Sequence, residues 1–156
     1  MIGIALAFLG AALSVVLPGF GSAIGVGKTG QAGAGVISEE PEKFGKVLLL
    51  QALPSTQGIY GFIGAFWIII KLRLLTGEIP PISWETGLAI LFGAFPVALT
   101  GFVSALYQAG VSISSMNVVV KQPQDSGKSI IMAAMVETYA VLGLLATILL
   151  IQGIKI

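Results

Sequence analysis

The stretch Ser129–Leu145 reads SIIMAAMVETYAVLGLL, and it places one carboxylate, Glu137, in the middle of an otherwise apolar run. A charged side chain at the centre of a bilayer costs about 2.5–3.5 kcal/mol on insertion scales, so an ionisable residue there usually has a function. Glu137 is the only acidic residue inside a long apolar segment of this chain. It is therefore the first candidate for a functional residue.

The composition of the chain is that of an integral membrane protein. Of the 156 residues, 56% are hydrophobic and only 10% are charged, whereas soluble domains carry roughly 25% charged residues. The net charge of +1 offers no basic surface for nucleic acid. Because the chain contains no Cys and no His, it lacks the thiolate and imidazole ligands that zinc, iron and copper prefer.

Several apolar segments are long enough to cross about 30 Å of hydrocarbon at roughly 1.5 Å per residue. Lipid tolerates only helices and closed barrels, and runs of this length without alternation of period two are helices. We therefore predict an all-α membrane protein with four transmembrane helices near residues 3–35, 46–71, 86–119 and 128–153.

The chain matches itself when it is shifted by 82 positions without a gap. The identical residues include those of two polar loops, where Pro41, Gly45 and Lys46 align with Pro123, Gly127 and Lys128. We predict two duplicated helical hairpins with the same orientation, residues 1–72 and 86–156, joined by a loop at 73–85. The repeat partner of Glu137 is Ser55, so one carboxylate serves four helices.

The basic residues indicate an orientation in the membrane. Five of them lie on the side of the first and third loops: Lys28, Lys43, Lys46, Lys121 and Lys128. The other three lie on the opposite side: Lys71, Arg73 and Lys155. The positive-inside rule then places loops 38–45 and 120–127 in the cytoplasm and both termini and the loop 73–85 outside. Trp67 and Trp84 are expected to anchor the outer interface.

Several polar side chains are expected at the depth of the carboxylate. Gln108 lies 15 positions before Pro123 and Glu137 lies 14 positions after it, and Thr56 and Gln57 hold matching places in the first hairpin. In an antiparallel hairpin, residues equally far from the turn share one level. A lone Gln or Thr in a membrane helix often serves only to form a hydrogen bond between helices, which contributes about 0.6 kcal/mol. The shared depth favours ligand roles for both glutamines and leaves the role of Thr56 open.

This group of side chains predicts an oxygen cage for a hard cation. Pro54 has no N–H and its ring disfavours the usual helical hydrogen bond, so a nearby backbone carbonyl is expected to be free, that of Leu50 or that of Leu53. Tyr60 and Tyr139 are each expected to place a hydroxyl near the carboxylate.

A nucleotide site is not expected in this chain. Gly27-Lys28-Thr29 is similar to the end of a phosphate loop, but the position of the required upstream glycine is Ser22 and no strand precedes it. Small residues at spacing four in the first helix, such as Gly19, Ala23 and Gly27, instead favour close helix packing in an inner layer.

The motifs LPSTQGIY at 53–60 and MVETYA at 135–140, together with Gln108, resemble those of the membrane rotor-ring proteolipid of V-type ATPases, and in particular its sodium-transporting bacterial branch. The resemblance implies a homo-oligomeric ring in lipid that turns with a central-stalk subunit against a stator subunit with an essential arginine. It implies a non-catalytic subunit with Glu137 as the ion-carrying carboxylate, a hydrogen bond from Tyr60 to that carboxylate, and Na⁺ ligands at Leu53 (carbonyl), Thr56, Gln57, Gln108 and Glu137.

The expected function is Na⁺ transport on Glu137 as the ring rotates, driven by ATP hydrolysis in a separate soluble head. One carboxylate per four helices predicts few ions per ATP, and hence a pump rather than a synthase. Two other functions remain open from the sequence. One is a proton-carrying rotor of the same architecture, and the other is an antiporter that exchanges protons for a small cationic molecule.

Overall fold

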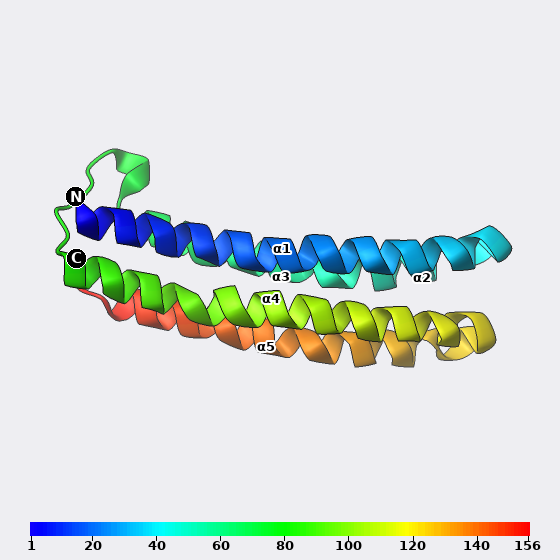
Figure 1. Cartoon of the computed structure of the whole chain (residues 1–156). Helices are drawn as coiled ribbons and strands as arrows, with labels where there is room; N and C mark the ends of the chain where they lie inside the picture. Colours follow the sequence, from blue (N-terminus) through cyan, green and yellow to red (C-terminus); the bar gives the residue numbers. More distant parts are fainter.

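A computed structural model describes the whole chain, residues 1–156, as a bundle of long helices (Figure 1). The α-helices are α1 Ile2–Glu39, α2 Phe44–Ala52, α3 Thr56–Lys71, α4 Trp84–Lys121 and α5 Ser126–Gly153. Short 3₁₀ turns connect or interrupt them: η1 Pro41–Lys43, η2 Leu53–Ser55, η3 Leu74–Thr76 and η4 Pro123–Asp125. Four helical stretches are long and apolar enough to cross a membrane. The all-α prediction with four spanning segments is therefore confirmed.

The structure differs from the expected helix bounds in two respects. The first and third spanning helices extend further than 3–35 and 86–119, because α1 ends only at Glu39 and α4 runs from Trp84 to Lys121. The second stretch, expected as one helix over 46–71, is divided into α2 and α3 by the turn at Leu53–Ser55. Pro54 causes this interruption, since it cannot donate a backbone hydrogen bond.

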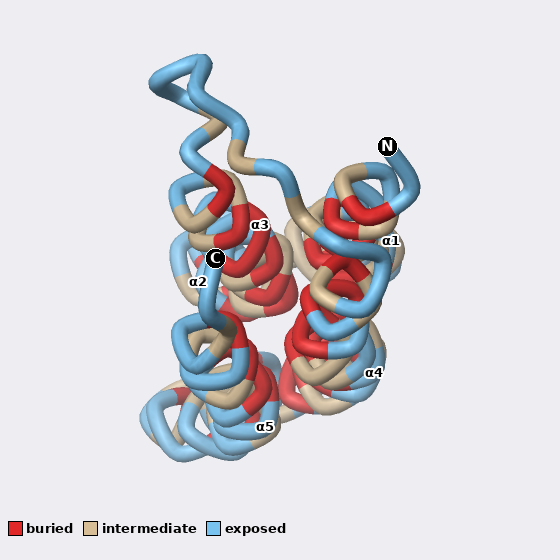
Figure 2. The backbone as a smooth tube through the Cα atoms, turned by 90° about the vertical axis from the view of Figure 1, so that its left-hand side faces the viewer, coloured by how far each residue is buried: buried red, intermediate tan, exposed pale blue.

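The helices form two layers when the bundle is viewed along its length (Figure 2). α1 lies beside α4 on one side, α2 and α3 lie beside α5 on the other, and the buried residues face the middle. α1 can approach its neighbours closely because its buried positions are mostly small residues three or four apart, at Gly3, Ala7, Gly10, Ser14, Pro18, Gly21, Gly25, Thr29 and Gly33.

Pro18 of α1 is the point where three helices meet. A Cβ atom built on Gly61 of α3 or on Gly101 of α4 would lie 2.8 Å from Pro18 Cγ in each case. Only glycine fits these two close approaches. Gly61 and Gly101 therefore lie at the same depth, on either side of one proline.

Two apolar clusters lie at opposite ends of the bundle interior. Val47, Leu50, Met116 and Val119 form the one near the loops at 40 and 122, and Ala7, Ile68, Leu72, Ile90, Ala94 and Ile151 form the one near the termini. The buried polar residues Gln57 and Gln108 lie in the sequence between these clusters. The fold thus holds a polar site in its middle, with an apolar cluster on either side of it.

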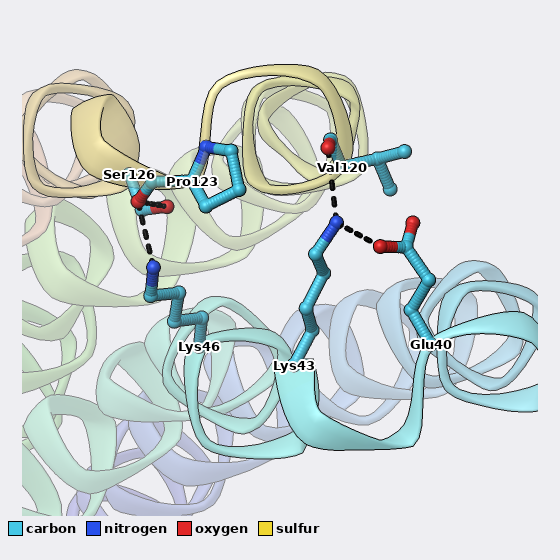
Figure 3. Close-up of polar contacts among 6 residues, drawn as sticks. All are labelled: Glu40, Lys43, Lys46, Val120, Pro123 and Ser126. Carbon is cyan, nitrogen blue, oxygen red and sulfur yellow. Dashed lines mark hydrogen bonds and ion pairs between the residues drawn. The ribbon is translucent and has the colours of Figure 1, made fainter.

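The two hairpins are joined by polar contacts at their loop ends (Figure 3). Lys43 Nζ donates to the carbonyl of Val120 at 2.9 Å and also pairs with Glu40. Lys46 Nζ donates to the carbonyl of Pro123 at 2.6 Å. Lys43 suits its place because Val120 lies in the last turn of α4, where the carbonyls lack helical partners and form the negative end of the helix dipole. Both bonds fix the first hairpin against the second.

Candidate cation site

The turn η2 brings the first part of the site into position. Pro54 is buried, and Thr56 begins α3 directly after the turn. The carbonyl of Leu53 accepts a hydrogen bond from the Thr56 hydroxyl at 3.0 Å and another from the Thr56 backbone N–H. The turn at Pro54 thus gathers a carbonyl oxygen and a hydroxyl oxygen at one point of the helix. The Leu53 carbonyl is not free as the sequence suggested, because it accepts both of these hydrogen bonds.

Two amide side chains meet beside this turn. Gln57 of α3 and Gln108 of α4 are both 0% exposed, and Gln57 Nε2 donates to Gln108 Oε1 at 2.5 Å. Gln57 Oε1, however, is buried without any hydrogen-bond partner. A buried acceptor left unpaired costs about 1–3 kcal/mol, so this oxygen is available to bind a ligand.

Glu137 of α5 completes the group and is partly buried. Its Oε1 accepts a hydrogen bond from the Tyr60 hydroxyl, and its Oε2 lies 3.5 Å from Gln108 Nε2. Gln108 Nε2 also donates to the carbonyl of Ala133 at 3.2 Å, one turn before Glu137. The carboxylate is thus held by one side chain from each hairpin.

The structure brings together most of the residues that the sequence singled out, and it separates one. Leu53, Thr56, Gln57 and Tyr60 come from the first hairpin and Gln108 and Glu137 from the second. Tyr139 differs from the expectation, because it is 66% exposed and lines a groove on the outside of α4 and α5. Two residues along a helix correspond to a rotation of about 200°, so Tyr139 and Glu137 point in nearly opposite directions.

Two contacts of the site were not expected from the sequence. The carbonyl of Ala133 accepts from Gln108, and no sequence signal marks a backbone acceptor inside a regular helix. Ser22 of α1 accepts a hydrogen bond from the backbone N–H of Gly58 at 2.9 Å. The only sequence signal for Ser22 is a hydroxyl in an apolar helix, which is also common at ordinary packing positions.

The arrangement suits a small hard cation. Carboxylate, amide, hydroxyl and backbone oxygens are the ligands that unpolarisable cations prefer. Rotation of a Gln amide by 180° exchanges its N–H₂ donor for its oxygen acceptor, so both glutamines can present oxygen to a cation. The single negative charge of Glu137 balances a monovalent ion.

Fold and site together define a class: a duplicated membrane hairpin with one partly buried carboxylate between its halves. The family model that describes the C subunit of ATP synthase matches residues 9–68 and again residues 91–150. The two matches are 82 residues apart, which is the offset of the internal repeat. The chain therefore belongs to the ATP synthase C-subunit family.

Two relatives resemble the chain over most of its length. The V-type sodium ATPase subunit K of Enterococcus hirae is 43% identical over 149 residues, which cover 96% of this chain and 92% of that protein. The A-type ATP synthase subunit K of Methanocaldococcus jannaschii is 38% identical over 146 residues, which cover 94% of this chain and 61% of that protein.

Proposed function

We propose that this chain is the rotor-ring subunit of a sodium-pumping V-type ATPase and that it carries Na⁺ on Glu137. The observation that carries the proposal is the buried, unpartnered Oε1 of Gln57. Gln57 bonds to Gln108, and Gln108 in turn lies 3.5 Å from Glu137, the one carboxylate in the middle of a spanning helix. The name of the Enterococcus hirae relative, a sodium ATPase subunit, agrees with this function.

The proposed Na⁺ ligands are oxygen atoms from both hairpins, with a hydroxyl from Tyr60 to hold the carboxylate. They are the Leu53 carbonyl, Thr56 Oγ1, Gln57 Oε1, Gln108 Oε1 and a carboxylate oxygen of Glu137. A proton-carrying rotor needs only the carboxylate. Two fully buried amides would then add a desolvation cost without a use, and this favours Na⁺ over H⁺ as the transported ion.

The proposed mechanism follows from the cost of a bare charge in lipid. While a subunit faces lipid, bound Na⁺ neutralises Glu137. Where it faces the stator subunit, an arginine replaces Na⁺ as the counter-charge and the ion leaves through an aqueous path. ATP hydrolysis in the soluble head turns the ring through the central stalk, so the chain itself is non-catalytic and binds no nucleotide. With one carboxylate per four helices, each ATP moves few ions and can work against a steep gradient.

In this proposal, loops 38–45 and 120–127 face the cytoplasm and both termini lie outside. The two loops already lie against each other through Lys43 and Lys46. They form one polar surface at one end of the bundle, and the central stalk would contact the ring at this end.

Carbodiimide labelling of Glu137 in the assembled complex tests the proposal. A carbodiimide reacts with a protonated carboxyl group, and bound Na⁺ blocks that reaction. We expect Na⁺ to slow the labelling in a saturable way, with a half-protecting concentration that rises as the pH falls because H⁺ and Na⁺ compete for one carboxylate. A labelling rate that is the same at all Na⁺ concentrations would instead favour the proton-carrying rotor.

Two opposite faces of the bundle support assembly into a ring. A groove of about 510 Å³ lies between α4 and α5, and it is lined by Leu99, Thr100, Val103, Ser104, Tyr107, Val136 and Tyr139. On α3, Phe62 and Phe66 are stacked with ring centroids 6.2 Å apart and are 61% and 42% exposed. Phe62 follows Tyr60, which contacts α5, by two residues, so it points away from α5.

The aromatic pair and the groove lie at the same depth, because Gly61 and Gly101 both contact Pro18. A second copy at the same height in the membrane therefore presents Phe62 to the groove of the first. A contact between two different faces of identical chains is heterologous, and it closes into a ring when the rotation per copy permits.

Cysteine cross-linking tests this contact, since the chain has no cysteine of its own. The double variant Phe62→Cys with Val103→Cys should give a ladder of disulfide-linked multimers on oxidation, because the two positions face each other only between neighbouring copies. The matched control is the double variant Val103→Cys with Leu149→Cys. Leu149 lies near the C-terminal end of α5, far in depth from the groove, so no ladder should form. An intact ring that yields only monomers from the first pair would rule out this packing.

A further inference from the structure

We infer that Ser22 is a positioning residue for the cation site, because its hydroxyl caps the start of α3 at the break. This inference rests on the proposed function of the site. Ser22 lies on α1, is 7% exposed, and its Oγ accepts the backbone N–H of Gly58 at 2.9 Å. It contacts neither Glu137 nor the two glutamines through a hydrogen bond.

The Ser22 hydroxyl provides a hydrogen-bond acceptor for an N–H group in the first turn of α3. The first N–H groups of any helix lack helical acceptors, and Ser, Thr, Asp or Asn at the preceding position usually provides one. At the start of α3 the preceding residue is Ser55, whose hydroxyl donates back to the carbonyl of Ala52 at 2.6 Å and makes no cap bond. The acceptor for Gly58 comes instead from another helix, 36 residues earlier in the chain.

α1 is in contact with the break and with the helix that follows it. Within the break, a Cβ atom on Gly25 would lie 2.8 Å from Pro54 Cβ. After it, a Cβ atom on Gly58 would lie 3.5 Å from Ser22 Cβ and 3.6 Å from Gly19 Cα. The glycines allow α1 to approach the turn closely, and the Ser22 hydroxyl is the hydrogen-bond acceptor at this contact.

The second half of the repeat provides an internal comparison. The partner of Ser22 under the 82-residue shift is Ser104, and the partner of Gly58 is Ala140. α5 continues through Ala140 without interruption, and the Ser104 hydroxyl bonds within its own helix, to the carbonyl of Gly101 at 3.4 Å. The bond between helices thus occurs only in the half where the helix is broken.

Ser22 acts on the ion through the first turn of α3. Thr56 and Gln57 directly precede Gly58, and both contribute proposed ligands. When the Gly58 N–H is held, this turn is fixed relative to Gln108 and Glu137 on the other hairpin. Loss of the hydroxyl loosens the ligand geometry, so it should weaken Na⁺ binding without slowing a saturated enzyme.

The test uses Ser22→Ala in the complete membrane-bound ATPase complex. We expect the Na⁺ concentration that half-protects Glu137 against carbodiimide to rise roughly five- to tenfold, the size expected for one lost buried hydrogen bond. The half-saturating Na⁺ concentration for ATP hydrolysis should rise by the same factor. The maximal rate at saturating Na⁺ should remain within about twofold of the unsubstituted complex.

Three further variants make the test decisive. Ser22→Thr keeps the hydroxyl and should restore Na⁺ affinity, and Ser114→Ala removes an exposed hydroxyl that bonds within α4 and should leave the affinity unchanged. If Ser22→Ala does not assemble, Ser22→Cys replaces it, since a thiol has the same shape as the hydroxyl but is only a weak acceptor. An unchanged affinity in the Ala or Cys variant, or an equal rise with Ser114→Ala, would overturn the inference.

A Glu137→Gln complex separates failure of this inference from failure of the proposed function. If Na⁺ stimulates ATP hydrolysis in that complex as it does in the unsubstituted one, the proposed function itself is wrong. If Na⁺ stimulation is lost there while Ser22→Ala binds Na⁺ normally, only the role of Ser22 is refuted.

Discussion

Glu137→Gln should reduce ATP-driven Na⁺ uptake into vesicles by roughly 100-fold. The substitution keeps the size of the side chain and removes its charge, so a cation at the site would remain unbalanced. An unpaired charge at mid-membrane costs about 2.5–3.5 kcal/mol on insertion scales, and about 1.4 kcal/mol corresponds to a factor of ten. Uptake of radioactive sodium by reconstituted complexes measures the effect.

The matched control is Glu85→Gln, the same change at an exposed residue in the first turn of α4. This variant should transport Na⁺ at the normal rate, because Glu85 lies far along α4 from Gln108 and outside the site. Normal uptake by the Glu137→Gln complex would mean that another group carries the ion.

Gln108→Ala should weaken Na⁺ binding to the isolated ring by roughly 10- to 100-fold, and Gln57→Ala by a similar factor. A hydrogen bond or ligand contact to a charged group is worth about 1.5–3 kcal/mol. The effect of Gln108 should be the larger of the two, because its amide also contacts Glu137 and the carbonyl of Ala133. Equilibrium binding of radioactive sodium gives the Kd of each variant.

The two substitutions should not be additive. Gln57 Nε2 bonds directly to Gln108 Oε1, so removal of one amide already disturbs the other. Gln31→Ala, at an exposed position of α1, serves as the control and should bind Na⁺ normally. Single glutamine variants with an unchanged Kd would show that the amides are only interhelical packing contacts.

Much of the fold follows from features that a sequence displays directly. Helices in lipid must satisfy their own backbone, so length and apolarity are enough to locate the four spanning segments. The ungapped repeat relates the two halves, and counting from the loop prolines predicts that Gln57, Gln108 and Glu137 meet. The hydrogen bonds among these side chains agree with that depth argument.

The remaining contacts could not be predicted from the sequence, because they depend on rotation about the helix axes and on packing between distant segments. Depth alone does not distinguish Tyr60, which bonds to Glu137, from Tyr139, which faces the outer groove. The bond from Gly58 to Ser22 joins two helices whose relative rotation is set by packing at glycines. The contacts of Lys43 and Lys46 with the other hairpin likewise leave no periodic pattern in the sequence.

Counting the sodium ions bound to the purified ring tests the central claim most directly. That claim is that oxygen atoms from both hairpins bind one ion in each chain. Equilibrium binding of radioactive sodium should saturate at one ion per chain, and acidification should compete with it. Saturation at two ions per chain, or no saturable binding at neutral pH, would contradict the account.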